Sequence, residues 1–147
     1  LALFMGNVVG SKGRVITYEK NLEFAEVAKK NIEMAGLEDA VVLRTKDVME
    51  GFDEEDGSAD AVTLDMDEAW KMAGEAKRVL KRGGRIGVYT LYVEHAKEAH
   101  GALLDQGFAE VRTIESLTRG MEFRKQGSRP KTSRVGHSGY LSFGRKV

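Results

Sequence analysis

The sequence has 147 residues, 41% hydrophobic and 31% charged, which is typical of one globular domain with a core of its own. It has no cysteine and no apolar run of the roughly 20 residues that a membrane helix needs, so disulfide bonds, thiolate metal sites and a membrane span are excluded. The net charge is zero, but residues 118–147 carry eight basic side chains against one acid, which predicts an anionic partner for that segment.

The first third of the chain is expected to alternate helix and strand. Residues 1–9 resemble the end of a helix, and since a domain seldom begins inside a helix, an upstream strand and loop are expected to be missing. Residues 14–19 are rich in β-branched and aromatic side chains, which predicts a strand. Asn21 is a suitable cap for a helix that runs to about residue 35, and residues 40–44 predict a second strand.

The rest of the chain continues this alternation and then changes. The expected elements are, in order, a strand at 60–65, a helix at 67–80, a strand at 85–90, a helix at 94–104, a strand at 108–117, a long basic loop and a strand at 139–144. Strands that alternate with helices, followed by two strands with no helix between them, predict an α/β fold with a parallel sheet and an antiparallel strand at its C-terminal end.

Polar side chains follow four of the predicted strands. Glu19, Asp47, Asp65 and Tyr89 each lie at or just past a strand end. The carboxyl ends of parallel strands share one edge of a sheet, and such sheets bind ligands there. We therefore expect these four side chains to meet in one crevice.

Two of these acids suit a nucleoside. A carboxylate after the second strand of a Rossmann-like sheet commonly accepts from both ribose hydroxyls, which predicts that role for Glu19. The alternative is an acid that stabilises the start of the following helix. Asp47 is a candidate acceptor for an adenine amino group, although aspartates are also common in loops.

Several segments carry a resemblance to one family. They are residues 1–4 (LALF), 64–71 (LDMDEAWK), 79–84 (VLKRGG), 88–90 (VYT) and 135–141 (VGHSGYL). Together, in this order and over nearly the whole chain, they resemble the tRNA (adenine-N1)-methyltransferases that modify adenosine 58 of the T-loop. The family commonly has prolines where this sequence has Asp67, Ala69 and Leu91, and those prolines shape the loops around the target base.

The resemblance implies a Rossmann-like class I S-adenosylmethionine-dependent methyltransferase sheet whose first strand is missing. Residues 1–147 would then be part of the catalytic domain, without its glycine-rich loop or the family's upstream β domain, and inactive alone. It also implies S-adenosyl-L-methionine as cofactor, tRNA as substrate, a homotetramer, a cytoplasmic location and no membrane. No metal is expected, and the three histidines are scattered.

Carried over by position, the resemblance assigns roles to particular residues. Glu19 would hold the cofactor ribose, Asp47 with Val48 its adenine, and Asp65 would lie at the catalytic centre against the cofactor. A carboxylate there holds the 6-amino group of the target adenine, orients N1 for attack on the methyl group, and stabilises the positive charge that develops.

The target base must leave its stack, because N1 lies on its pairing edge. Tyr89 is the expected platform for the extruded base, with Tyr92 and Trp70 as alternatives. Plain core packing is an equally open explanation of these aromatic residues, and we favour it for Trp70.

The basic segment would hold tRNA phosphates. Its candidate residues are Arg119, Arg124, Lys125, Arg129, Lys131 and Arg134. A solvated basic segment, or one that pairs with the chain's own acids, is the other explanation.

Three other functions remain open. A small-molecule methyltransferase acting on a corrinoid precursor would leave the basic segment unexplained. A non-catalytic RNA-binding subunit would have no use for Asp65 and Glu19. A nicotinamide-dependent reductase is compatible with the fold alone.

Overall fold

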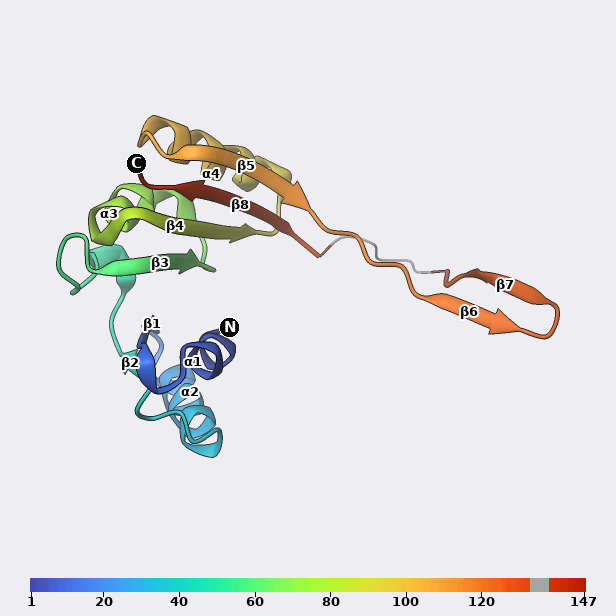
Figure 1. The fold of residues 1–147 in the computed structure, drawn as a ribbon, viewed down its shortest axis with the longest axis horizontal. Coiled ribbons are helices and arrows are strands. Elements are labelled where there is room, and N and C mark those ends of the chain that lie inside the picture. Colours follow the sequence, from blue (N-terminus) through green and yellow to red (C-terminus); the bar gives the residue numbers. More distant parts are fainter. Residues whose placement is uncertain (133–137) are drawn as a thin grey trace. The chain divides into compact units, whose positions relative to one another are not determined.

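The structure, a computed structural model, describes residues 1–132 and 138–147, and the chain divides into two compact units, residues 1–51 and 52–147 (Figure 1). Each unit combines helices with a sheet that contains parallel strands. The α/β class predicted from the sequence is therefore confirmed.

The first unit contains a parallel pair of strands with two α-helices. Its elements are α1 (Ala2–Val9), η1 (Gly10–Lys12), β1 (Val15–Tyr18), α2 (Leu22–Met34), β2 (Val41–Arg44) and η2 (Val48–Glu50). Its core is formed by Val15, Ile32, Ala40 and Val41. Gly6 of α1 lets this helix approach β2, because a Cβ at that position would collide with the Val41 side chain.

Helix α2 begins where its cap predicts. The Asn21 Oδ1 atom accepts hydrogen bonds from the backbone N–H groups of Glu23 at 2.9 Å and Phe24 at 3.2 Å, which satisfies two donors that have no partner within the helix. Ala25 and Ile32 form its buried face. The strands and the helix expected between residues 14 and 44 are thus confirmed.

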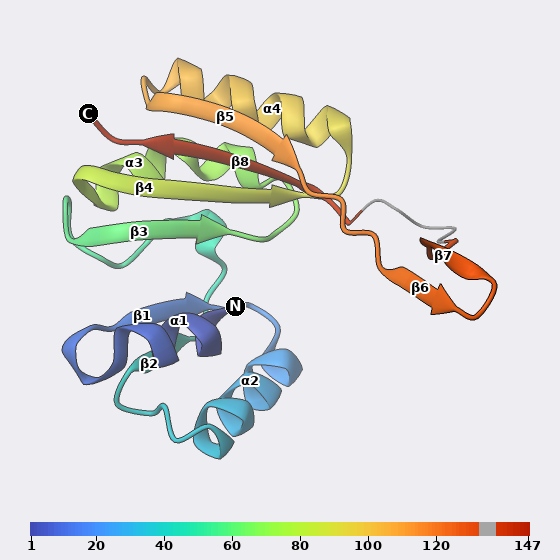
Figure 2. The ribbon, with the colours of Figure 1, turned by 45° about the vertical axis from the view of Figure 1, so that its right-hand side comes forward.

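The second unit contains a mixed four-stranded sheet with the order β3-β4-β8-β5 (Figure 2). Its elements are β3 (Ala59–Leu64), η3 (Ala69–Met72), α3 (Ala73–Val79), β4 (Leu80–Thr90), α4 (Val93–Asp105), β5 (Ala109–Glu115), β6 (Met121–Arg124), β7 (Gly127–Pro130) and β8 (Tyr140–Arg145). Strands β3 and β4 are parallel, and β8 is antiparallel to both β4 and β5. The antiparallel C-terminal strand is therefore confirmed.

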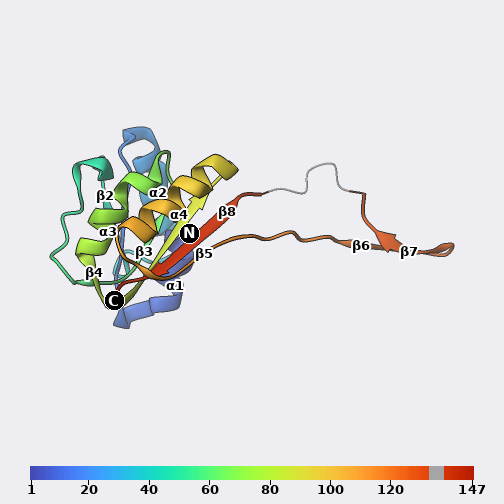
Figure 3. The same ribbon diagram turned by 90° about the horizontal axis from the view of Figure 1, so that it is seen from above.

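Helices α3 and α4 cover one face of this sheet (Figures 2 and 3). Ile86 and Val88 of β4 are buried on that face, as are Ala99 and Leu103 of α4. On the other face the Arg112 guanidinium lies 5.4 Å from the centre of the Phe143 ring. The packed helices fix the loops that follow β3 and β4.

Two boundaries differ from the sequence prediction. The helix expected at residues 67–80 begins only at Ala69, because Glu68 has left-handed backbone angles (φ 51°) and its N–H donates to Asp67 Oδ1 at 3.0 Å. Strand β4 begins at Leu80 rather than at residue 85, since it pairs with Ala59 across an irregularity in β3.

The segment predicted as a basic loop contains a hairpin, so that prediction is wrong for residues 121–130. Strands β6 and β7 are antiparallel, with Met121 opposite Pro130 at one end and Arg124 opposite Gly127 at the other. Glu122 forms ion pairs with Arg124 of the same strand at 2.5 Å and with Arg129 of β7 at 3.6 Å, and the second pair joins the two strands. Arg134 and residues 135–137 of the last family motif lie outside the described residues.

Within the described ranges, every helix is too short or too polar to cross a lipid bilayer.

Candidate active site

Glu19 and Asp47 follow neighbouring parallel strands and so lie at the same edge of the first unit's sheet. The Glu19 N–H donates to the Arg44 carbonyl at 3.0 Å, which holds Glu19 beside the end of β2. The next residue, Lys20, reaches across to Asp47, with 3.1 Å between Nζ and Oδ2. The structure thus brings together the strand ends that carry the two predicted cofactor ligands.

Both carboxylates make local hydrogen bonds. Asp47 Oδ1 accepts from the Met49 N–H at 3.0 Å, and Glu19 Oε1 accepts from the Asn21 N–H at 2.8 Å. The Met49 hydrogen bond, followed by the contact with Lys20, lowers the pKa of Asp47. A carboxylate has about four acceptor positions, so these bonds leave room for a ligand's hydroxyl or amino groups. Val48 follows Asp47 at the start of η2 and is half-buried.

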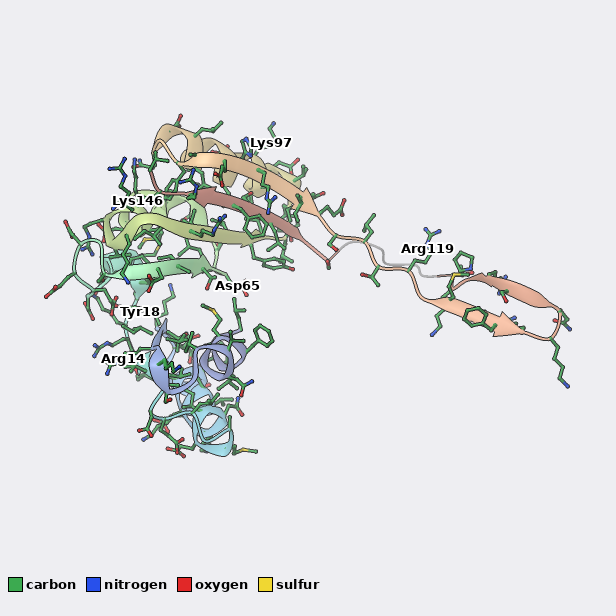
Figure 4. All side chains as sticks on the ribbon, in the orientation of Figure 1. Arg14, Tyr18, Asp65, Lys97, Arg119 and Lys146 are labelled. Carbon is green, nitrogen blue, oxygen red and sulfur yellow. The ribbon has the colours of Figure 1, made fainter. Side chains whose placement is uncertain are left out.

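Asp65 directly follows β3 and lies at the carboxyl end of that strand (Figure 4). It borders a pocket of about 300 Å³ whose lining residues are Asp65, Met66, Asp67, Tyr89, Thr90, Leu91, Tyr92 and His95. Seven of them lie at or just after the carboxyl ends of the parallel strands β3 and β4, and His95 lies in the first turn of α4. Of the four side chains expected in one crevice, the structure brings Asp65 and Tyr89 together at this pocket.

The Asp65 carboxylate has no hydrogen bond or ion pair with any other residue that the structure describes, and it is exposed. The neighbouring acids do have partners: Asp67 accepts a hydrogen bond from the Glu68 N–H, and Glu68 forms an ion pair with Lys71 at 2.6 Å. Asp65 therefore offers a full set of acceptor positions to a ligand in the pocket.

Tyr89 is held by the segment that enters β8. Its hydroxyl donates to the Ser138 carbonyl, and its ring lies against the backbone of Gly139. A Cβ on Gly139 would lie 2.5 Å from Tyr89 Cζ and 2.6 Å from the hydroxyl oxygen. Because the hydroxyl is engaged, Tyr89 offers its ring rather than a proton donor to a ligand.

The structure adds two pocket residues that the sequence did not single out. His95 lies in the first turn of α4, with its ring centre 4.8 Å from Trp70 and 5.3 Å from Tyr92. Thr90 is 6% exposed, and its hydroxyl has no partner among the described residues. The only signal in the sequence was their place just after a strand end. Trp70 is half-buried and contacts His95, so core packing describes it only in part.

Five of the six predicted RNA-binding residues are described, and all five are exposed. Arg119 lies on the segment between β5 and β6 (Figure 4). Lys125 is in the hairpin turn, and the Lys131 N–H donates to the Gly120 carbonyl at 2.8 Å, next to the hairpin strands. The remaining two residues, Arg124 and Arg129, form ion pairs with Glu122.

In the parts of the chain that the structure describes, no three His, Asp or Glu side chains are grouped closely enough to hold a metal ion. Glu19 and Asp47 belong to one unit, whereas Asp65 and Tyr89 belong to the other. A single crevice formed by all four remains a prediction.

A mixed sheet with acids after its parallel strands is the architecture of class I S-adenosylmethionine-dependent methyltransferases, and solved structures support this class. A SAM-dependent O-methyltransferase from Thermotoga maritima matches 97% of the chain with a TM-score of 0.89 and 33% identity, and the match covers 53% of that protein. The tRNA (m1A58) methyltransferase TrmI from Aquifex aeolicus matches 91% of the chain with a TM-score of 0.80 and 25% identity, over 53% of its length.

The family model for the tRNA methyltransferase complex GCD14 subunit matches residues 2–129, and the chain belongs to this family. The tRNA (adenine(57)-N(1)/adenine(58)-N(1))-methyltransferase TrmI of Methanocaldococcus jannaschii is 33% identical over 171 residues, which cover 99% of the chain and 60% of that protein. The chain therefore spans little more than half the length of these relatives. The resemblance seen in the sequence motifs is confirmed.

Proposed function

We propose that the chain is the larger part of the catalytic domain of a tRNA methyltransferase that transfers a methyl group from S-adenosylmethionine to N1 of adenosine 58 in the T-loop. The observation that carries this proposal is the Asp65 carboxylate, free of partners among the described residues, in a pocket beside Tyr89. Membership of the GCD14 family supports tRNA as the substrate class.

The residues of the first unit suit the cofactor. Two carboxylates at one sheet edge provide acceptors for two ribose hydroxyls and an amino group. Glu19 would hold the ribose, and Asp47 with Val48 the adenine. When bound, the cofactor supplies an electrophilic methyl group on a positively charged sulfur.

Asp65 would orient the target base and stabilise its positive charge. It accepts a hydrogen bond from the 6-amino group, which orients the N1 lone pair toward the methyl group, and it faces the positive charge that the methylated base acquires. Two unit charges 4 Å apart attract by about 1 kcal/mol in water and about 4 kcal/mol near a protein surface. Bound RNA that excludes water therefore increases the contribution of Asp65 several-fold. The Tyr89 ring stacks on the extruded base.

The test is Asp65→Ala in the full-length protein, with labelled S-adenosylmethionine, unmodified tRNA and nucleoside analysis. We expect methyl transfer to be abolished while tRNA binding remains nearly intact. Asp105→Ala, an exposed carboxylate at the end of α4, is the matched control and should keep full activity. Turnover by Asp65→Ala would remove this residue from the mechanism.

The proposal extends to the basic segment. Arg119, Lys125 and Lys131 would bind tRNA phosphates, and Arg124 and Arg129 would contribute although they share Glu122. Arg134 would complete this set. A tRNA substrate makes the cytoplasm the expected compartment.

A homotetramer is also part of the proposal. In the hairpin, Phe123 is 80% exposed and Met121 is 46% exposed. These two side chains alternate with the charged Glu122 and Arg124 along β6. An isolated two-stranded hairpin is marginally stable in water, so an apolar face of this kind is suited to contact another copy. Phe123→Ser should shift the mass measured by light scattering toward smaller species, whereas Phe24→Ser on α2 should not; an unchanged mass would separate Phe123 from assembly.

The other functions considered gain no comparable support. A corrinoid-precursor methyltransferase would leave the exposed basic residues without a role. A non-catalytic subunit would not need the unpaired Asp65. A reductase is disfavoured by the family membership.

A further inference from the structure

We infer that the rim of the Asp65 pocket is a second base-binding subsite, where Tyr92, supported by His95 and Trp70, stacks a nucleobase next to the target adenosine in the RNA strand. The inference rests on the proposed function and adds a contact outside the reacting base.

The first observation is an exposed aromatic ring that contacts a neighbouring ring. Tyr92 is 61% exposed, yet its ring makes an edge contact with His95 at 5.3 Å between centres and 83° between planes. His95 in turn rests against Trp70 at 4.8 Å. This chain of contacts supports Tyr92 from the protein side and leaves most of its surface open to a ligand.

The second observation concerns polar atoms. Neither the Tyr92 hydroxyl, the Trp70 indole N–H nor the His95 ring nitrogens form a hydrogen bond with any described residue. In this cluster of three aromatic side chains, Tyr92 and His95 line the pocket, and no polar atom of the three rings is bonded to a described residue, so the cluster can bind both the face of a base and its edges or the adjoining phosphate.

The third observation is continuity with the candidate catalytic pocket. Tyr92 and His95 line the same pocket as Asp65 and Tyr89. Extruding one base from an RNA loop also unstacks its neighbours, and single-stranded RNA is held by stacking successive bases on aromatic side chains. Tyr89 serves the target base in the proposed mechanism, so Tyr92 is available for the adjoining base. Every base has a π-face, so this subsite accepts any base.

The experiment uses the full-length protein and two tRNAs, each with 2-aminopurine in place of the base on one side of adenosine 58. Stacking quenches 2-aminopurine fluorescence. We expect the wild-type protein to change the fluorescence of one of the two tRNAs on binding. Tyr92→Leu should remove this change and weaken tRNA binding about 5- to 160-fold, the range for loss of one base–aromatic stack. Tyr92→Phe should retain both.

Phe24→Leu is the matched control, because Phe24 is 62% exposed on α2. Trp70 contacts His95, so tryptophan quenching on tRNA binding that is lost in Trp70→Phe places the bound base next to this cluster independently. The inference is overturned if the wild-type protein leaves both 2-aminopurine signals unchanged, a result that does not depend on any variant being folded. It is also overturned if folded Tyr92→Leu binds tRNA like wild type. Methylation of adenosine 58 by the wild-type protein tests the proposed function separately. If methylation occurs while the subsite test fails, only the subsite is refuted. If adenosine 58 is not methylated, the proposed function itself is refuted.

Discussion

Gly139 determines where the Tyr89 ring can lie. The Tyr89 hydroxyl donates to the carbonyl of Ser138, and the ring occupies the space where a side chain at position 139 would begin. Gly139 also has φ +149°, a backbone conformation that residues with a Cβ rarely adopt. The family resemblance at residues 138–141 thus has a physical meaning, since this segment forms the support behind a pocket residue.

Gly139→Ala should therefore displace Tyr89. We expect the kcat/KM for tRNA to fall about 10- to 100-fold, since misplacement of a positioning group by about 1 Å has effects of that order, with cofactor affinity unchanged. The same substitution in a Tyr89→Leu background should add little, because the contact is already absent. Gly101→Ala is the control, since a Cβ there meets nothing within 4 Å. Full activity of Gly139→Ala would contradict a positioning role.

At the scale of elements, the pair Lys20–Asp47 connects the ends of β1 and β2. Lys20 follows β1, Asp47 precedes η2, and the Asp47 carboxylate also accepts from the Met49 N–H. The short parallel pair has four residues in each strand, so a link between the loops at its carboxyl edge supports the same edge that carries the candidate cofactor residues.

The lowered pKa of Asp47 has a consequence for stability. Its folded pKa lies below the unfolded value of about 3.9, so the charged carboxylate contributes stability above that value and loses it as the pH falls through the folded pKa. Asp47→Asn should therefore be less stable than wild type at pH 7, with a difference that shrinks below pH of about 4. Urea unfolding at several pH values measures this difference. Lys20→Met should show a smaller loss of stability at pH 7, since the Met49 hydrogen bond is the largest cause of the lowered pKa of Asp47. A stability difference between Asp47→Asn and wild type that stays constant with pH would exclude this explanation.

Elements governed by local rules could be predicted from the sequence, and the exceptions have local causes. Asn21 identified the start of α2 because a side chain that accepts from two N–H groups is a property of the residue itself. The start of η3 could not be predicted, because it depends on the left-handed conformation of Glu68. The β6–β7 hairpin was missed because its strands are exposed and only four residues long: β6 alternates apolar and charged residues over too few positions to stand out, and β7 shows no such alternation.

For the molecule as a whole, the sequence predicted which residues follow the strands but not what surrounds them. Asp65 and Tyr89 meet because β3 and β4 are parallel neighbours, which the order of elements already implied. Thr90 directly follows Tyr89 at the end of β4, whereas His95 joins the pocket through the packing of α4 on the sheet, which depends on contacts distant in sequence. The single crevice that joins Glu19 and Asp47 to this pocket depends on the placement of two units and stays a prediction.

The separation of charge along the chain leads to a prediction for the whole molecule. Lys125 and Lys131 are exposed and are not among the residues paired with Glu122, so their neutralisation leaves the ion pairs of the hairpin in place. Each phosphate contact contributes about 0.7–0.9 to the slope of log affinity against log salt concentration. Lys125→Gln/Lys131→Gln should therefore reduce this slope by about 1.4–1.8 and weaken binding of different tRNAs alike, because phosphate contacts carry no sequence information.

Lys29→Gln/Lys97→Gln removes the same charge from exposed positions on α2 and α4 and should leave the slope unchanged (Figure 4). The comparison of the two double variants separates a local contact from the effect of net charge, because both variants lower the total charge equally. Equal slopes for both would mean that the basic segment acts only through the overall field of the protein.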